Sequence, residues 1–224
     1  MLIVAATVVL VAASMGIATR QDLSGTSLVF IVPAIPYILF TILAVARMRK
    51  EGTLAEKLRP RSGDLTFGAI VTVMLLLGAL VGRSIIAPHG SVREGWLMRI
   101  YLQVGDPDVL QRHMLGVSLA VVIVAGLEEV SWRGYVYQVL EERFGTRRAF
   151  PATALLYALA HVPTMFLLKA PFAGLNPLVV IAALGCGLVW GLVVARTGRL
   201  PVAIISHALF TLAVAIHFPL WRLA

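Results

Sequence analysis

The chain has 224 residues, of which 59% are hydrophobic and only 13% are charged, and its mean hydropathy is +0.91. Soluble domains are nearer half apolar and a quarter charged, so this composition excludes an ordinary soluble protein. The formal net charge is +8. No basic patch interleaved with aromatic residues lies outside the apolar stretches, so the charge indicates membrane topology and not nucleic-acid binding.

Seven apolar segments have the length, or nearly the length, of a membrane-spanning helix, which needs about 20 mostly apolar residues. The fourth segment is the shortest and is expected to continue past Glu129. The chain is therefore predicted to be all-α, a polytopic transmembrane helix bundle of about seven spans. The segments are Leu2–Thr19, Ser27–Ala46, Leu65–Ala87, His113–Leu127, Ala149–Leu168, Ala173–Ala195 and Leu200–Phe218.

Residues 1–112 carry three of these spans and no diagnostic motif, and residues 113–224 carry the others. We treat both parts as one integral domain. The first segment has no basic n-region and leads through a short turn into the next span, so we expect a retained anchor and not a cleaved signal peptide. Between the third and fourth spans, Val92–Val104 is predicted to form an amphipathic helix at the outer surface, with a solvated loop as the alternative.

Two features of the sixth span concern packing. Gly187 and Gly191 form a GxxxG pair, a spacing that allows another helix to approach closely. Cys186 is the single cysteine, so an intramolecular disulfide is excluded and a small packing residue is expected.

The positive charges predict the orientation of the bundle. Eleven cations fall on the side of the loop 47–64, against seven on the other side. Cytoplasmic loops are enriched in Lys and Arg. The N-terminus and this loop are therefore predicted to be cytoplasmic and the C-terminus outside, in a bacterial-type cell membrane. Six of the cations lie in the loop itself, namely Arg47, Arg49, Lys50, Lys57, Arg59 and Arg61.

The first of three polar clusters within the spans is Glu128-Glu129-Val-Ser-Trp-Arg133. At about 100° per residue, Glu129 and Arg133 are i,i+4 neighbours on one helical face and can form an ion pair. Glu128 points about 140° away from Arg133. It is therefore expected to remain an uncompensated carboxylate, which suits a general base. The alternative is a salt-bridge cluster at a helix end without a chemical role.

The two other clusters each place a histidine within a span. Tyr157-Ala-Leu-Ala-His161 lies in the fifth span, where Pro163 removes a helix hydrogen bond, and His207-Ala-Leu-Phe-Thr211 lies in the seventh. Ionisable residues within spans are costly and by default suggest function. An inert, hydrogen-bonded core histidine is the alternative in each case.

The depths of the three clusters converge. The acids lie near the cytoplasmic end of the fourth span, and the histidines lie a few turns in from the same side. A carboxylate base, two imidazoles and a hydroxyl are therefore expected to meet in a polar cavity that faces the cytoplasm. This set of groups is typical of a hydrolytic site.

In this order the clusters resemble the motifs EExxxR, FxxxH and HxxxN/D of the CAAX prenyl protease and bacteriocin-processing family of intramembrane glutamate proteases (CPBP, or Abi-type). The similarity covers roughly residues 115–217 and includes the stretch ARTGRLPVAIISHALF. Tyr157 stands where the family has phenylalanine, and Thr211 stands where it has an amide or an acid.

The resemblance implies a role for each matched residue. Glu128 would activate a water with help from His161, and Glu129 and Arg133 would hold Glu128 in place. The side chains of the third motif would hydrogen-bond the oxyanion of the tetrahedral intermediate.

Within that third motif, we expect unequal contributions. A threonine hydroxyl is a single donor on a short stem and can bond back to a helix carbonyl, so Thr211 is predicted to be a partial donor. His207 is then expected to carry most of the oxyanion stabilisation.

No cofactor is expected. A metal-free mechanism is favoured because no HExxH is present and the two histidines lie on separate helices. If zinc is used, the predicted ligands are His161, His207 and Glu128.

The sequence thus predicts a CPBP-type intramembrane endopeptidase. It would hydrolyse peptide bonds of membrane-associated, prenylated or otherwise lipid-anchored substrates near the cytoplasmic face, by glutamate-activated water. Its partners would be a peptide or protein substrate in or at the membrane and the lipid bilayer, without nucleic acid. The alternatives are a non-catalytic membrane scaffold or immunity protein, and a proton-coupled transporter. We find no internal repeat of the kind that marks many transporters.

Overall fold

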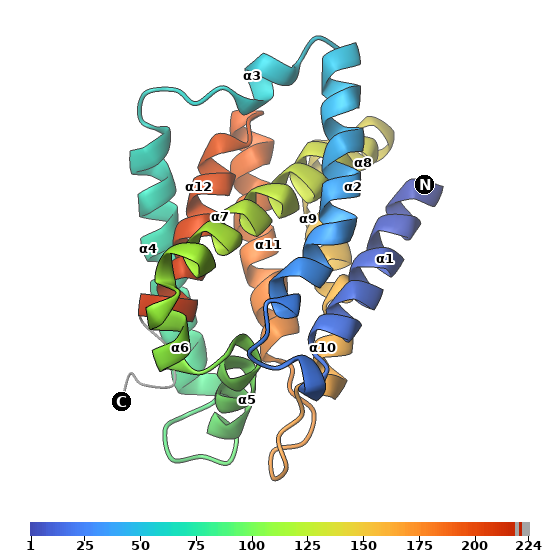
Figure 1. Cartoon of the computed structure of the whole chain (residues 1–224). Coiled ribbons are helices and arrows are strands. Elements are labelled where there is room, and N and C mark those ends of the chain that lie inside the picture. Colours follow the sequence, from blue (N-terminus) through green and yellow to red (C-terminus); the bar gives the residue numbers. More distant parts are fainter. Residues whose placement is uncertain (218–219, 221–224) are drawn as a thin grey trace.

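The computed structural model describes residues 1–217 and residue 220. In this part the chain forms helices joined by loops and has no β-strand, so the predicted all-α class is confirmed. Figure 1 shows the long helices side by side in one bundle. The N-terminal elements are α1 (Leu2–Ala18), the 3-10 turn η1 (Gln21–Leu23), α2 (Leu28–Lys50), α3 (Leu54–Leu58), α4 (Asp64–Ile86), α5 (Glu94–Val104) and α6 (Pro107–Arg112).

The C-terminal elements carry the three motifs. The fourth predicted span continues past Glu129, as expected, through a π-helical turn, and forms one helix of 31 residues, Met114–Phe144. The fifth span is interrupted at His161. The elements are α7 (Met114–Ser131), the π turn η2 (Trp132–Val136), α8 (Tyr137–Phe144), α9 (Thr146–Ala160), α10 (Val162–Leu167), α11 (Leu178–Thr197), α12 (Pro201–Leu212) and a second π turn, η3 (Ala213–His217).

Within the described residues, five helices are long and apolar enough to cross a membrane, and two shorter apolar helices, Leu2–Ala18 and Pro201–Ile216, complete the set of seven. The chain is an integral membrane protein. The five long helices are Leu28–Lys50, Asp64–Ile86, Met114–Phe144, Thr146–Leu167 and Leu178–Thr197.

The sixth span begins at Leu178 and not at Ala173, which corrects the predicted boundary. Pro177 disfavours a helical conformation in the residue before it. That residue, Asn176, is buried in a loop, and its side-chain amide donates to the backbone carbonyls of Trp96 at 2.9 Å and Leu168 at 3.1 Å. The last residue of the predicted seventh span, Phe218, lies outside the described residues.

The loops between the helices lie at the ends of the bundle where the predicted membrane topology places them. Helix α3, the turn between α8 and α9 and the turn between α11 and α12 lie at one end of the bundle, which we call the α3 end (Figure 1). Helices α5 and α6 lie at the opposite end. The cation-rich loop 47–64 is therefore on the same side as the other basic turns. Arg222, which the prediction placed on the opposite side, lies outside the described residues.

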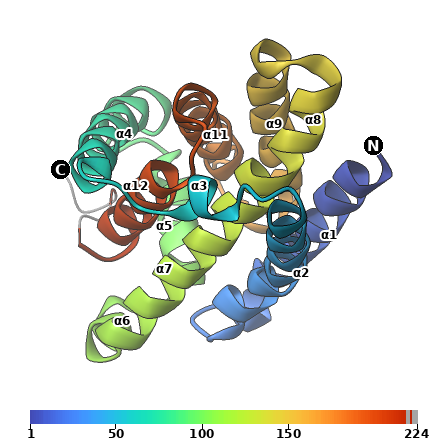
Figure 2. The ribbon, with the colours of Figure 1, turned by 90° about the horizontal axis from the view of Figure 1, so that it is seen from above.

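The N-terminal helices pack against the helices that carry the motifs. Seen from above, α7 runs between α2 and α12, and α4 lies outside α12 (Figure 2). Thr41 of α2 lies 3.3 Å from the Ser131 hydroxyl of α7, and that hydroxyl donates to the Tyr37 carbonyl at 3.0 Å. On the other side, the Thr72 hydroxyl of α4 lies 3.3 Å from the Ser206 carbonyl of α12.

A clamp joins α3 and the start of α4 to the turn between α11 and α12. Both terminal nitrogens of Arg199 bond to Asp64, at 2.9 and 2.7 Å. The Leu200 amide donates to the Lys57 carbonyl at 3.0 Å. This clamp fixes the start of α12 and, through it, the depth of the third motif.

Two predicted helix features can be compared with the structure. Gly187 of the GxxxG pair lies so close to α9 that an added Cβ would be 3.3 Å from the Ala154 backbone, so close helix approach is confirmed. The predicted surface helix forms as α5. Its Gln103 is buried, and the side-chain amide of this residue donates to the carbonyls of Ala18 and Arg20 at 2.8 and 3.0 Å.

The close approach of α4 to α12 can be tested at Gly68. A Cβ there would lie 2.7 Å from the Ile205 side chain, whereas a Cβ at Gly78 on the same helix would meet nothing within 4 Å. We expect Gly68→Ala to lower the thermal midpoint in detergent, because overpacking costs roughly 1–3 kcal/mol. Gly78→Ala should keep or raise the midpoint. Equal midpoints for the two variants would contradict the α4–α12 packing.

Candidate active site

The end of α7 is buried although it is rich in polar groups. Glu128 is 7% exposed, and Glu129, Ser131 and Arg133 are 0% exposed. After Ser131 the helix widens into the π turn, which contains Arg133 and is a local form that is frequent at functional sites. Within that turn Gly134 allows neighbouring helices to come close, because an added Cβ would lie 2.9 Å from a side-chain atom of α2.

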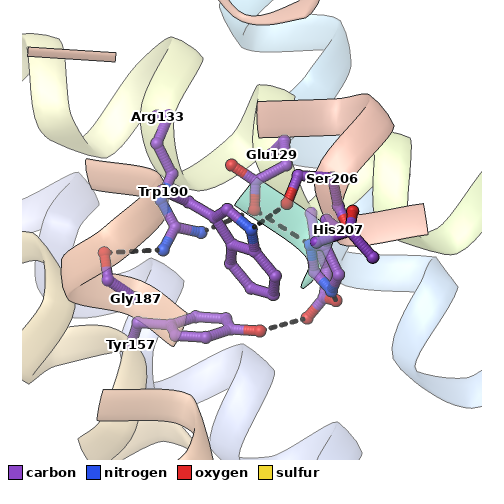
Figure 3. A network of polar contacts seen from close by, with 9 residues as sticks. Glu129, Arg133, Tyr157, Gly187, Trp190, Ser206 and His207 are labelled. Atoms are coloured by element: carbon purple, nitrogen blue, oxygen red, sulfur yellow. Dashed lines mark hydrogen bonds and ion pairs between the residues drawn. The ribbon is translucent and has the colours of Figure 1, made fainter. Parts of the chain in front are cut away.

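The predicted ion pair between Glu129 and Arg133 is present. Arg133 Nη1 donates to Glu129 Oε1 at 2.8 Å. Its Nη2 donates to the Gly187 carbonyl at 3.2 Å, and the guanidinium lies over the rings of Tyr157 and Trp190, at 4.9 and 5.5 Å from the ring centroids. Figure 3 shows these groups converging from different helices. Carboxylate, carbonyl and π faces together stabilise the buried cation.

His207 of α12 lies between the two glutamates. Its Nδ1 is 2.9 Å from Glu129 Oε1, and its Nε2 is 3.3 Å from Glu128 Oε2. The ring stacks on Trp190 with 3.9 Å between centroids and an angle of 18°. The Trp190 indole in turn donates to the Ser206 hydroxyl at 3.3 Å (Figure 3). The imidazole plane is therefore held by stacking and by both nitrogens.

The expectation that Glu128 is an uncompensated carboxylate is wrong. In addition to the contact with His207, its Oε1 accepts a hydrogen bond from the Tyr157 hydroxyl at 3.4 Å. The geometry of a single helix does show that Glu128 and Arg133 point apart. The partners of Glu128 come from α9 and α12, however, and a helical projection of α7 cannot show them.

Charges of opposite sign are paired within this cluster. Arg133 is always cationic, and Glu129 accepts a hydrogen bond from it. Because Glu129 also contacts His207 Nδ1, the other ring nitrogen is directed toward Glu128 Oε2.

His161 caps α9 at the interruption of the fifth span, and it is 6% exposed. Its Nδ1 lies 2.8 Å from the Tyr157 carbonyl. A carbonyl only accepts, so Nδ1 carries the proton and Nε2 is left as an acceptor. Its ring also packs edge-on against the Tyr157 ring at 4.7 Å. Tyr157 thus connects His161 to Glu128.

Thr211 lies one helical turn beyond His207 and is partly exposed. Its hydroxyl has no hydrogen bond to another described residue, so the predicted bond back to the His207 carbonyl is not formed there. In this arrangement both His207 nitrogens face carboxylates. That His207 carries most of the oxyanion stabilisation and Thr211 a smaller part therefore stays a prediction. The contacts of His207 in this structure do not favour it.

The alternative zinc ligands can be examined in the same geometry. Among the described residues, no group of three or more His, Cys, Asp or Glu side chains is arranged to hold a metal ion. The Nδ1 of His161 is bonded to a backbone carbonyl, and His207 is bonded to glutamates on both sides. Glu128 and the two histidines thus do not form a ready tetrahedral set.

Arg133 also borders a small polar cavity of about 80 Å³ near the α3 end. The sequence predicted a polar cavity on this side that contains Glu128, His161 and His207. Of the predicted site residues, the observed cavity is lined by Arg133 alone. Its lining consists of Lys57, Arg133, Tyr137, Gln138, Glu141, Val194, Ala195, Gly198 and Leu200.

Sequence reasoning missed two residues that hold the site together, Trp190 and Ser206. Trp190 follows Gly187 by one helical turn in the sixth span, so the close helix approach expected at the GxxxG pair could have drawn attention to it. Ser206 directly precedes His207. Small hydroxyl residues are common in spanning helices, and nothing distinguishes this one in the sequence.

A polytopic helix bundle with a buried carboxylate–imidazole cluster is thus the class of protein that fold and site define. Residues 111–213 match the family model described as Type II CAAX prenyl endopeptidase Rce1-like, a family of proteases. The match contains all three motifs. This segment therefore matches the CAAX protease family that the motifs predicted. Comparisons with curated proteins and with solved structures gave no match.

The contribution of the buried Glu129–Arg133 ion pair can be tested by measuring the thermal midpoint of variants. Arg133→Ala should lower the thermal midpoint in detergent strongly, because a buried carboxylate without its partner costs roughly 3–5 kcal/mol. The double variant Glu129→Gln/Arg133→Met should recover much of that loss. Arg20→Ala, which removes an exposed ion pair, serves as the control and should change the midpoint little. Equal midpoints for the single and double variants would contradict the role of the pair.

Proposed function

We propose that this chain is an intramembrane endopeptidase in which Glu128 activates a water molecule. The observation that carries the proposal is the contact between Glu128 Oε2 and His207 Nε2 at 3.3 Å, with Glu129 2.9 Å from the other ring nitrogen. A carboxylate held by this contact has a fixed orientation, and its Oε1, which accepts from Tyr157, keeps a second lone pair for a water. Such a group is a general base at a fixed position.

The proposed reaction proceeds in two steps. The water oxygen adds to the scissile carbonyl carbon while Glu128 takes a proton from the water. The tetrahedral intermediate then collapses as the C–N bond breaks, and the same proton passes from Glu128 to the leaving amine nitrogen. The products are a carboxylic acid and an amine, and the site returns to its starting protonation state.

The neighbouring side chains have supporting roles in this scheme. His161 offers its Nε2 lone pair to the second hydrogen of the water, because its Nδ1 proton is held by the Tyr157 carbonyl. Tyr157 also donates to Glu128 through its hydroxyl. The pair of Glu129 and Arg133 keeps the His207 ring in place, and stacking on Trp190 prevents its rotation.

The proposed substrates are lipid-anchored peptides, with the prenylated CAAX type first among them. The family match supports this class, and the position of the motifs supports entry near the α3 end, which the positive charges predict to be cytoplasmic. Because the site is enclosed by membrane helices, a lipid anchor in the bilayer would keep the scissile bond at the depth of Glu128.

The base can be tested with Glu128→Gln, using a fluorogenic farnesylated peptide that ends in a CAAX sequence and protein in liposomes. The amide keeps the shape of the side chain but cannot accept the proton, so the rate should fall by roughly 10²–10⁴-fold. Glu56→Gln on exposed α3 is the matched control and should cleave at the parent rate. Cleavage by Glu128→Gln at the parent rate would rule out Glu128 as the base.

The third motif can be tested by separating its two polar residues. His207→Ala removes the partner of both glutamates and should abolish most cleavage of the same peptide. Thr211→Val should reduce it far less, because the Thr211 hydroxyl is partly exposed and has no hydrogen bond among the described residues. Thr211→Asn should keep or raise the rate. A Thr211→Val variant as inactive as His207→Ala would show that the hydroxyl is essential.

Metal independence is also part of the proposal. Purified protein should contain far less than one zinc per chain and should keep its cleavage rate after treatment with a chelator. One tightly held zinc per chain, lost with activity and restored by adding zinc, would instead assign the ion to His161, His207 and Glu128.

A further inference from the structure

The polar cavity at the α3 end lies between the surface of the bundle and the buried ion pair. Its volume is about 80 Å³, whereas a single water needs only ~10–15 Å³, so the cavity admits a group larger than one water. The residues that line it range from Arg133, which is 0% exposed, to Gly198, which is exposed. A ligand that enters from the α3 end would therefore meet the cation that holds Glu129.

Three side chains of the lining carry hydrogen-bond donors that no other described residue uses. Both terminal nitrogens of Arg133 are engaged, by Glu129 and by the Gly187 carbonyl, but its Nε is buried without a partner. Gln138 is 6% exposed, and its side-chain amide makes no hydrogen bond within the described part of the chain. Lys57 makes no ion pair there. Buried polar groups nearly always have a partner, so these donors indicate a bound ligand.

The charges at this end of the bundle favour an anion as that ligand. Arginine and lysine bind carboxylates through charge-assisted hydrogen bonds, which are stronger than bonds between neutral groups. Residues 47–64, 141–148 and 196–199, which form the α3 end, contain eleven Lys and Arg side chains against five carboxylates. An excess of one sign of charge around a cleft attracts ions of the opposite sign.

Glu141 limits the charge that the ligand can carry, because it is the carboxylate of the lining. Its Oε1 accepts from the hydroxyls of Tyr137 and Thr146 at 2.6 and 2.7 Å, so these donors already serve it. A dianion such as phosphate would face this charge at close range and be repelled. A monoanion meets less repulsion and still pairs with Lys57. The lining therefore fits a carboxylate better than a phosphate.

We propose that this cavity is a binding site for a carboxylate group, held by Lys57, Gln138 and the Nε of Arg133. Two sources share this chemistry, namely the C-terminal carboxylate of a peptide and a small free carboxylate. The peptide source rests on the proposed function, whose products include a carboxylic acid, whereas the site itself does not. Because Arg133 also bonds Glu129, the ligand would contact the same cation that orders the glutamate–histidine cluster.

The test uses N-acetyl-trialanine, its C-terminal amide, acetate and inorganic phosphate as probes, with the thermal midpoint of the protein in detergent as the readout. The acetyl group removes the charge of the peptide amine, so the carboxylate is the single charge of the peptide acid. This acid should raise the midpoint of the parent as its concentration rises, because a ligand that binds the folded state stabilises it. The amide has the same size without the charge and should leave the midpoint unchanged.

Two variants locate the binding in the cavity. Gln138→Leu and Lys57→Met each remove a donor of the lining while keeping most of the side-chain volume. Each should raise the peptide concentration needed for half of the maximal shift by roughly tenfold or more, as expected when a hydrogen bond to a charged group is lost. Lys50→Met is the matched control, because it makes the same change at an exposed cation of the α3 end that does not line the cavity. It should respond as the parent does.

Equal shifts with the peptide acid and its amide, or a parental response in both cavity variants, would overturn the carboxylate site. The absence of a shift with every probe would show a cavity filled by water alone and overturn it too. Phosphate that acts at a lower concentration than the peptide acid would overturn the choice of a monoanion.

The remaining comparison identifies the source of the carboxylate. A response to acetate at the same concentration as to the peptide acid would assign a small free carboxylate, whereas tighter binding of the peptide would assign a peptide C-terminus. None of these measurements uses cleavage. A failure of the proposed function would therefore be seen separately, in the assays with Glu128→Gln and its parent.

Discussion

The site depends on one buried positive charge. Arg133 is 0% exposed within a spanning helix, where a charge is costly unless it is paired. The compensation comes from separate helices: Glu129 from its own helix, the Gly187 carbonyl and the Trp190 ring from α11, and the Tyr157 ring from α9. Because Glu129 also bonds the α12 histidine, neutralising the cation brings the three motifs together. The polar core therefore holds the bundle together as well as forming the proposed site.

Local periodicity explains which parts of this arrangement could be predicted from the sequence. Glu129 and Arg133 are four residues apart on one helix, so their contact follows from helix geometry alone. The order of the three motifs likewise predicted the family. The contact between Glu128 and His207 joins residues from different helices, and it depends on helix rotation and depth. Hydropathy does not determine either quantity, which is why Glu128 was wrongly expected to lack a partner.

The N-terminal helices illustrate a second limit of sequence reasoning. Residues before 111 lie outside the family match and carry no motif, yet α2 and α4 pack against the helices that bear the glutamates and His207. The contacts that α2 and α4 make with these helices are formed by common residue types. A threonine, a serine and a backbone carbonyl join α2 to α7, and a glycine admits Ile205 to the surface of α4. Residues of this kind are frequent in all spanning helices, so their importance becomes visible only when the packing is known.

The π turn at Trp132–Val136 has a consequence for chain length. A π turn accommodates one residue more than an α-helix over the same rise, because its hydrogen bonds join residues five apart. Deleting one residue within it would therefore restore a regular helix in which α8 keeps roughly its present direction. Deleting one residue from the regular part of α7 would instead rotate everything after it by about 100° relative to what precedes it, and the link from α8 to α9 would have to be rebuilt. The π turn is therefore the place in this spanning helix where the loss of one residue disturbs the later helices least.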